Sequence, residues 1–244
     1  MREQTFCIEG QRPLAPGVYE LRLNGDVSAI TAPGQFVNLK LDGFFLRRPL
    51  SVCDVLPGKL ILIYKVVGHG TDALSRMAPG RELSVLTGLG NGYDLSPAGN
   101  APLLIGGGGG IPPLYYLAKQ LIQAGKPVAA VLGFNTAREV FYEDEFRALG
   151  CRVTVATVDG SRGVKGFVTD ALPEVYSYFY TCGPEPMLKA VYRATVTGGQ
   201  FSFEERMGCG FGACMGCSCK TVTGSKRICR EGPVLRKEEI LWER

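Results

Sequence analysis

The stretch LLIGGGGGIPPLYYLAKQ, residues 103–120, indicates the fold of the middle of the chain. A short apolar run ends in five glycines, Gly106, Gly107, Gly108, Gly109 and Gly110, and residues 111–124 then read as a helix. A glycine loop that feeds a helix N-terminus presents backbone N–H groups and the positive end of the helix dipole to a pyrophosphate. The G-x-G-x-x-G fingerprint is not matched, because Ile111 stands at its last glycine position. We expect these glycines to bind a nucleotide without a standard Rossmann site, and a flexible linker is the alternative.

The same alternation of strands and helices continues to about residue 198. Residues 128–134, 152–158 and 176–181 read as strands, and residues 140–149 and 186–194 as helices. Such alternation implies a doubly wound parallel sheet. Cys182, Gly183 and Pro184 follow the last strand, where small residues leave room for a ligand. No acidic residue marks the ribose position after the second strand, so NAD and NADP both stay open.

Residues 1–98 have a different pattern, of short alternating strands separated by turns. This spacing predicts an antiparallel barrel or sandwich, interrupted by a helix over residues 71–77 with Thr71 as its N-cap. The segment 96–100 reads as a linker to the nucleotide-binding layer. We thus expect a mixed β and α/β protein with domains at residues 1–98, 99–198 and 199–244.

The third unit contains five of the nine cysteines of the chain. Cys209, Cys214 and Cys217 follow the C-x4-C-x2-C spacing with Cys229 as a distant fourth thiol, which is the plant-type pattern for a 2Fe-2S cluster. Interleaved glycines permit a tight loop around such a cluster. A four-cysteine zinc site is the alternative, although zinc ribbons usually pair two short knuckles. A ligand set with Cys219 in place of Cys217 also stays open.

A basic segment lies at a strand start within the first unit. Arg48, Pro49, Leu50 and Ser51, together with Gly70 and Thr71, offer a cation, hydroxyls and free amides, which suit a flavin and its pyrophosphate. A solvated basic pair is the simpler alternative for Arg47 and Arg48. The single histidine, His69, is expected at the surface and excludes sites built from several histidines.

Composition and charge exclude several classes of protein. The 244 residues carry a net charge of +4, too small to favour nucleic acid or an anionic membrane. No apolar run reaches the roughly 18 residues of a membrane span, and the first ten residues do not form a signal peptide. The crowded, odd-numbered cysteines make a poor disulfide framework. We expect a cytoplasmic protein.

Taken together, the segments resemble the ferredoxin-reductase family with an appended iron-sulfur unit. The order Arg48-Pro49-Leu50-Ser51, Gly70-Thr71, Gly106 to Pro113 and Cys182-Gly183-Pro184 is similar to that family. The stretches ERMGCG at 205–210 and CREGPV at 229–234 resemble one subfamily in particular. That subfamily comprises the electron-transfer subunits of NAD-dependent dihydroorotate dehydrogenase B.

The resemblance implies the binding sites. It assigns FAD to Arg48, Pro49, Leu50, Ser51, Ile63, Tyr64, Lys65, Gly70 and Thr71. It also implies cluster ligation by Cys209, Cys214, Cys217 and Cys229, and it places Cys182 near the nicotinamide as a catalytic residue. Many relatives carry Arg-x-Tyr-Ser at the flavin; Leu50 replaces the tyrosine here, and Tyr64 is the candidate substitute for stacking.

The resemblance also implies the reaction, which belongs to pyrimidine biosynthesis. A partner subunit that carries FMN and oxidises dihydroorotate passes electrons through the cluster and FAD to NAD+, in an expected heterotetramer of two copies of each chain. Two alternatives stay open. One is a reductase subunit of a hydrogenase, sulfite reductase or transhydrogenase complex, and the other is a zinc-binding interaction module.

Overall fold

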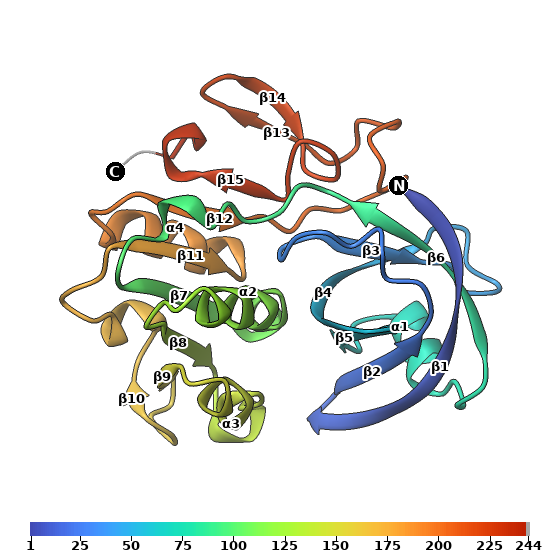
Figure 1. Ribbon diagram of the computed structural model, residues 1–244, viewed down its shortest axis with the longest axis horizontal. Helices are drawn as coiled ribbons and strands as arrows, with labels where there is room; N and C mark the ends of the chain where they lie inside the picture. Colours follow the sequence, from blue (N-terminus) through green and yellow to red (C-terminus); the bar gives the residue numbers. More distant parts are fainter. Residues whose placement is uncertain (243–244) are drawn as a thin grey trace.

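The first part of the chain closes into an antiparallel barrel, at the right of Figure 1. The computed structural model describes residues 1–242. The barrel strands are β1 (Arg2–Ala15), β2 (Val18–Asn24), β3 (Phe36–Leu39), β4 (Arg48–Leu56), β5 (Lys59–Lys65) and β6 (Glu82–Leu89), in the order β1-β2-β5-β4-β3-β6. Alternate residues point inward, as Leu60, Leu62 and Tyr64 of β5 do, so the two-residue period fills the barrel core.

A short helix, α1 (His69–Ser75), packs onto the barrel. Its Leu74 is fully buried in the barrel core, and Gln11 of β1 donates a hydrogen bond to the Leu74 carbonyl at 2.8 Å. The helix begins two residues earlier than the sequence predicts. Gly68 is the N-cap, so the N-cap assignment of Thr71 was wrong. The Thr71 hydroxyl instead lies in the first turn and accepts the Val67 and Gly68 amides at 3.0 and 3.3 Å.

A mainly parallel sheet forms the second part, at the left of Figure 1. Its strands are β7 (Pro102–Gly107), β8 (Ala129–Phe134), β9 (Arg152–Thr157), β10 (Val164–Lys165), β11 (Tyr178–Cys182), β12 (Gly199–Ser202) and β15 (Val234–Arg236), in the order β10-β9-β8-β7-β11-β12-β15. The chain runs outward from β7 on one side and resumes at β11 on the other, so the strand order reverses between these two neighbours. In doubly wound sheets ligands bind at this switch point, beyond the carboxyl ends of the strands.

Helices connect the strands of this sheet. They are α2 (Ile111–Gln123), α3 (Glu143–Ala148) and α4 (Glu185–Ala194), with 3-10 turns η1 (Ser96–Ala98), η2 (Gly108–Gly110), η3 (Ala137–Glu139), η4 (Val168–Ala171) and η5 (Lys237–Glu239). The predicted positions of α2 and α4 are confirmed to within a residue. The prediction of one helix over residues 140–149 was too long, since α3 begins only after Tyr142, whose backbone is left-handed with φ 64°.

The barrel and the sheet are joined by polar contacts across α2 and α3. Lys119 of α2 forms an ion pair with Asp54 of β4 at 2.8 Å. The Tyr142 hydroxyl donates to Glu20 of β2 at 2.9 Å, and Glu20 is almost completely buried. These contacts fix the barrel against the α2 face of the sheet, so groups bound by the two parts are held in one geometry.

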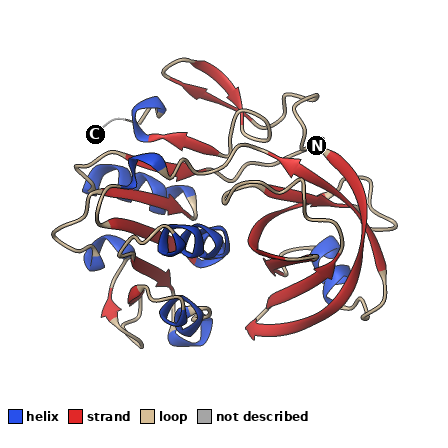
Figure 2. Ribbon diagram, in the orientation of Figure 1, coloured by secondary structure: helices blue, strands red, loops and turns tan. Residues whose placement is uncertain are grey.

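The cysteine-rich segment leaves the sheet and returns to it. The chain departs at the end of β12 and comes back as β15, whose Val234 pairs with Ser202 in an antiparallel register. Between them lies a hairpin of β13 (Ser218–Thr221) and β14 (Gly224–Arg227). Figure 2 shows that the rest of this excursion is loop. The predicted order of barrel, parallel sheet and small cysteine unit is confirmed, and no helix in residues 1–242 has the length and apolarity of a membrane span.

Candidate functional site

The glycine loop and the Cys182 segment meet at the switch point of the sheet. Gly106 of β7 pairs with Cys182 of β11 in parallel register. The five glycines then divide by their surroundings. A Cβ on Gly110 would lie 2.2 Å from the Cys182 carbonyl oxygen, and one on Gly107 would lie 2.4 Å from the Met187 sulfur. Gly110 needs glycine because the obstructing atoms are backbone, whereas a Cβ on Gly107 would require the Met187 side chain to move.

Gly108 and Gly109 face open space. A Cβ on either would meet no atom within 4 Å, and both residues retain exposure while their glycine neighbours are buried. Their backbone stands immediately before helix α2, where free N–H groups accumulate. The open backbone at Gly108 and Gly109 fits the pyrophosphate of a dinucleotide.

Cys182 lies at the carboxyl end of β11 with 1% of its surface exposed. Burial raises the pKa of its thiol strongly, and the nearby Glu204 carboxylate raises it further. The side chain is therefore a neutral thiol at neutral pH. Such a group can shape an apolar wall of a nicotinamide site but does not supply a thiolate nucleophile.

Arg48 links two of the predicted flavin segments, the start of β4 and helix α1. Arg48, Pro49, Leu50 and Ser51 are half-buried along β4. The Arg48 guanidinium crosses helix α1 so closely that a Cβ on Gly70 would lie 2.2 Å from its Nε atom. It also stands 4.8 Å from the centroid of the Phe44 ring. The structure thus brings together the cation and the two segments that the sequence singled out for the flavin.

Tyr64 does not offer its ring to a flavin. Its side chain points into the barrel core, is 4% exposed, and donates its hydroxyl hydrogen to Gln11 at 2.6 Å. The ring stacks on Tyr19, with centroids 5.9 Å apart and an angle of 21°. The expectation that Tyr64 replaces the family's aromatic residue was wrong, because strand alternation turns this position inward. Its neighbours Ile63 and Lys65 point to the opposite face.

Backbone N–H groups surround the sulfur of Cys209. Phe211, Ala213 and Cys214 donate to it at 3.5, 3.2 and 3.4 Å, and the Cys209 amide donates to the Cys214 sulfur at 3.4 Å. Burial opposes ionisation of Cys209, but these donors outweigh it and lower the pKa of the thiol to about 6. A sulfur held as thiolate by amides is the form in which cysteine binds metal.

The four predicted ligands form an outer and an inner pair. Cys214 is exposed and Cys209 is partly exposed, whereas Cys217 and Cys229 are each 2% exposed. The Cys229 amide donates to the Cys217 sulfur at 3.4 Å. Among residues 1–242, no group of three or more potential ligands converges as a single-ion cage. Two pairs of cysteine sulfurs suit a cluster with two irons, for which four cysteines are needed.

Arg227 braces this loop from the hairpin. It donates to the Gly212 carbonyl oxygen at 2.8 Å and pairs with the Glu231 carboxylate. The Arg227 hydrogen bonds lower the pKa of Glu231 to about 2. Both sides of the cysteine loop are therefore tied to β14, next to the buried pair of sulfurs.

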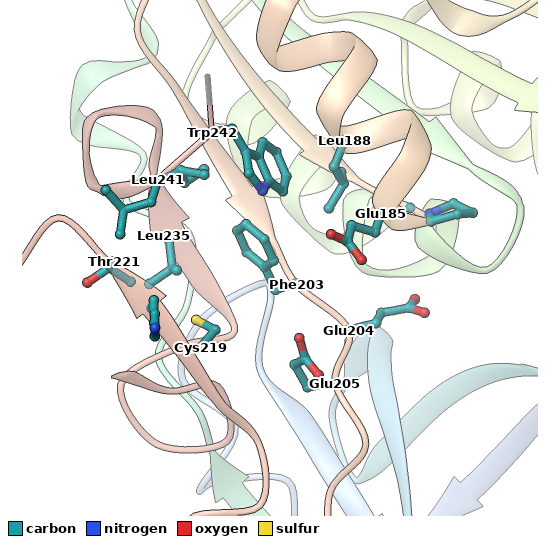
Figure 3. Close-up of a pocket in the computed structure, with 14 residues that line it drawn as sticks. Glu185, Leu188, Phe203, Glu204, Glu205, Cys219, Thr221, Leu235, Leu241 and Trp242 are labelled. Atoms are coloured by element: carbon teal, nitrogen blue, oxygen red, sulfur yellow. The ribbon is translucent and has the colours of Figure 1, made fainter. Parts of the chain in front are cut away.

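A cavity of about 240 Å³ lies between the Cys182 segment and the cysteine-rich excursion. Figure 3 shows Glu204, Glu205 and Cys219 around it, with Phe203 beside Trp242. Glu204 is exposed at the mouth of this cavity, and partial desolvation by neighbouring atoms raises the pKa of its carboxyl. Sequence reasoning missed Glu204, since an acidic residue beside another acidic residue gives no signal of its own.

Asn38 is a second residue that the sequence did not indicate. It is 1% exposed on β3, its amide Nδ2 donates to the Cys209 carbonyl oxygen at 3.2 Å, and its Oδ1 atom has no hydrogen-bond partner among residues 1–242. A buried acceptor without a partner costs about 1–3 kcal/mol.

Comparisons with known proteins match two parts of the chain to family models. Residues 204–241 match a family model described as the iron-sulfur cluster binding domain of dihydroorotate dehydrogenase B, and residues 104–193 match the oxidoreductase NAD-binding domain. The chain is 45% identical, over 99% of both chains, to the dihydroorotate dehydrogenase B (NAD(+)) electron transfer subunit of a Geobacillus species. The subunits of the same name from Listeria monocytogenes and Fusobacterium nucleatum are 44% and 40% identical over 98% of this chain.

Solved structures of other oxidoreductases share the fold of this chain. A chain of the NADH-dependent reduced ferredoxin-NADP oxidoreductase, from work on flavin-based electron bifurcation, superposes with a TM-score of 0.88 at 33% identity, covering 97% of this chain and 90% of that one. The ferredoxin reductase of carbazole 1,9a-dioxygenase has a TM-score of 0.68 at 23% identity and covers 79% of this chain, which speaks for the fold alone.

Proposed function

Because the chain belongs to the family of electron-transfer subunits of dihydroorotate dehydrogenase B, we propose that it is an oxidoreductase subunit that relays electrons to NAD+. When bound, a 2Fe-2S cluster supplies one-electron transfer and FAD supplies exchange between single electrons and a hydride. The residues of this chain bind and orient these groups and exclude water from them. The observation that carries the proposal is the set of backbone donors on the Cys209 sulfur, which poises it for the cluster.

The binding residues are assigned as follows. Arg48 to Ser51, with Ile63, Lys65, Gly70 and Thr71 and the backbone of Tyr64, hold FAD. Gly106 to Gly110, with Cys182, Gly183 and Pro184, hold NAD+, for which Gly108 and Gly109 leave open space. Cys209, Cys214, Cys217 and Cys229 hold the cluster. The domain limits of residues 1–98, 99–198 and 199–244 belong to this proposal, with the β12 and β15 strands as the attachment of the third unit.

The catalytic partner docks at the outer cysteine pair. Cys214 is exposed, and the neighbouring side chains of Phe211 and Met215 are 41% and 55% exposed. Apolar side chains that surround an exposed ligand suit a protein interface. We propose an FMN-containing dihydroorotate dehydrogenase subunit as the donor, two copies of each chain in the complex, and a cytoplasmic location. None of the nine cysteines, all within the described residues, forms a disulfide, which supports this location.

A second candidate donor follows from the structural comparison. The oxidoreductase that superposes with a TM-score of 0.88 takes part in electron bifurcation, so a flavin partner of that kind is the competing choice. Copurification separates the two. A partner that reduces this chain with dihydroorotate supports the first proposal, and a partner that reduces it only with another donor supports the second.

The test of the relay is an anaerobic absorption spectrum with iron and flavin analysis, before and after NADH. We expect flavin and two-iron bands that bleach with NADH. Cys217→Ser should remove the iron and keep the flavin, whereas the matched variant Cys219→Ser should keep both, since Cys219 lines the cavity and Cys217 lies beside Cys229. A colourless, zinc-loaded protein would overturn the redox proposal, and iron loss in Cys219→Ser alone would reassign that ligand.

A further inference from the structure

Asn38 lies between the two segments that the proposed function assigns to FAD and to the cluster. In strand β3, Val37 and Leu39 point into the barrel core, so Asn38 points outward. Its direct antiparallel partner on β4 is Pro49, and the next outward pair is Phe36 with Ser51. Side chains directly opposite each other share one face of the sheet. Asn38 therefore stands on the same face as Pro49 and Ser51.

The other side of Asn38 meets the cluster loop. Its Nδ2 atom donates to the Cys209 carbonyl oxygen at 3.2 Å, which assigns the amide orientation because a carbonyl can only accept. The next residue, Gly210, has φ +77°, and a Cβ on it would lie 2.4 Å from Nδ2 of Asn38. The loop thus approaches Asn38 at a residue without a side chain.

The Oδ1 atom of Asn38 gives a second, independent reason to assign this residue a role at the junction. It is buried, and no donor in residues 1–242 reaches it. A buried acceptor at a junction of two cofactor segments is satisfied by a donor that arrives with a bound group or an ordered water. Packing alone would favour an apolar side chain at this position, such as those that fill the barrel.

We propose that Asn38 is a positioning residue for electron transfer between the cluster and the flavin. Its amide holds the Cys209 backbone against β3, and so sets the position of the Cys209 sulfur relative to the flavin residues on β4. This inference rests on the proposed relay. It adds a contact between Asn38 and Cys209, which are 171 positions apart in the sequence. This contact fixes the cluster loop relative to the flavin-binding strand.

The test uses the full chain with Asn38→Ala and Asn38→Leu. Leu keeps nearly the shape of Asn but removes the donor and adds no charge, so both variants should behave alike. Hydrogen exchange of the amides of residues 208–214 should rise by about five- to tenfold in each, as loss of one hydrogen bond predicts. Transfer from reduced flavin to the cluster, followed by stopped flow, should slow by about tenfold or more, since small displacements of redox groups are costly.

Gln35→Ala is the matched control. Gln35 is also buried near β3, but its side chain accepts from Thr31 and Ala32 and donates to Gly90, and to none of residues 208–214. It should change neither exchange at residues 208–214 nor the transfer rate. Flavin reduction by NADH, measured in the same traces, identifies any general loss of the flavin site.

Three outcomes overturn the inference. They are unchanged exchange and transfer in Asn38→Ala, a wild-type transfer rate in Asn38→Leu, and an equal fall of flavin reduction and of transfer. If wild-type protein binds neither flavin nor iron, the proposed relay fails by itself. The exchange experiment still tests the contact between Asn38 and the cysteine loop in that case.

Discussion

Gly70 has no side chain at the point where the Arg48 guanidinium crosses helix α1. A Cβ there would lie 2.2 Å from Nε and 2.6 Å from the guanidinium carbon of Arg48. Gly70→Ala should push this cation away from the proposed flavin pyrophosphate. We expect FAD to bind about tenfold more weakly, within the range for a lost charge-assisted hydrogen bond. Flavin fluorescence during titration of the deflavinated protein measures this.

Gly68→Ala is the control for that prediction. Gly68 is the N-cap of the same helix, its backbone is extended, and a Cβ on it would meet no atom within 4 Å. FAD affinity should stay within about twofold of wild type, because the added methyl group reaches no atom of Arg48, although Ala is a poorer N-cap than Gly. Equal losses in both variants would mean that helix α1, rather than Arg48, is responsible.

At the scale of residues, the sequence predicts local sites better than distant ones. The spacing of Cys209, Cys214 and Cys217 is readable because a short loop must bring its own sulfurs together. The contact between Asn38 and Cys209 joins positions 171 residues apart, and no local pattern marks it. The inward direction of Tyr64 depends on the register of β5 in the barrel, which a flanking motif does not reveal.

The loop between β7 and α2 divides into packed and open glycines, and this leads to a prediction for the element. Gly110→Ala places a Cβ 2.2 Å from the Cys182 carbonyl oxygen. We expect a loss of about 1–3 kcal/mol of unfolding free energy from this overpacking, measured by urea denaturation.

Gly109→Ala is the matched change one residue earlier. Its Cβ enters open space and its φ is not in the left-handed region, so stability should be retained or rise by up to about 1 kcal/mol. The methyl group occupies the proposed pyrophosphate space instead, and NADH affinity should fall by about tenfold for one displaced phosphate contact. Unchanged NADH binding would move the dinucleotide away from this loop.

Helix α3 shows why element boundaries were harder to predict than element order. The sequence EVFYEDEFRAL has apolar spacing from Val140 onward, yet the helix begins at Glu143. Phe141 and Tyr142 are buried, and the Tyr142 hydroxyl reaches Glu20 of the barrel. This contact between domains holds Tyr142 in a left-handed conformation, and single-sequence periodicity contains no information about it.

At the scale of the molecule, the Lys119–Asp54 ion pair ties the sheet to the barrel. The Asp54 side chain is 8% exposed and the Lys119 side chain 21%. Lys119→Met leaves a largely buried carboxylate without its partner and should destabilise the protein by up to about 3 kcal/mol. Chemical denaturation followed by tyrosine fluorescence, which reports on both domains, measures this loss.

The double variant Lys119→Met with Asp54→Leu is the control. It removes both charges, so most of the stability should return. A second expected effect is slower flavin reduction by NADH in Lys119→Met alone, because the barrel and the sheet then move relative to each other. Equal stability of the single and double variants would contradict a role for the pair in joining the domains.

The order of the three units along the chain was predictable from the sequence. The return of the chain to the sheet after the cysteine-rich segment was not. A strand pattern with a two-residue period, a glycine loop before a helix and a cluster of cysteines each carry a local physical signal, and they occur in order along the chain. The pairing of β15 with β12 could not be predicted in this way. A segment of three residues, Val234–Arg236, is too short to show the period-two pattern of a strand. These three residues form a strand because they pair with β12 at the edge of the folded sheet.

Because β15 pairs with β12, the cysteine unit is an insertion whose two ends lie next to each other. Ser202 and Val234 are cross-strand partners, so the chain leaves and re-enters the scaffold at points that lie about 4.5–5.5 Å apart. The segment between them is nevertheless not separable, because its Cys217, Ile228 and Cys229 pack with Phe36 of the barrel in one buried cluster. The cysteine unit is therefore an insertion that can vary on its exposed side, around Phe211 and Met215, while its buried side is held by the barrel and the sheet.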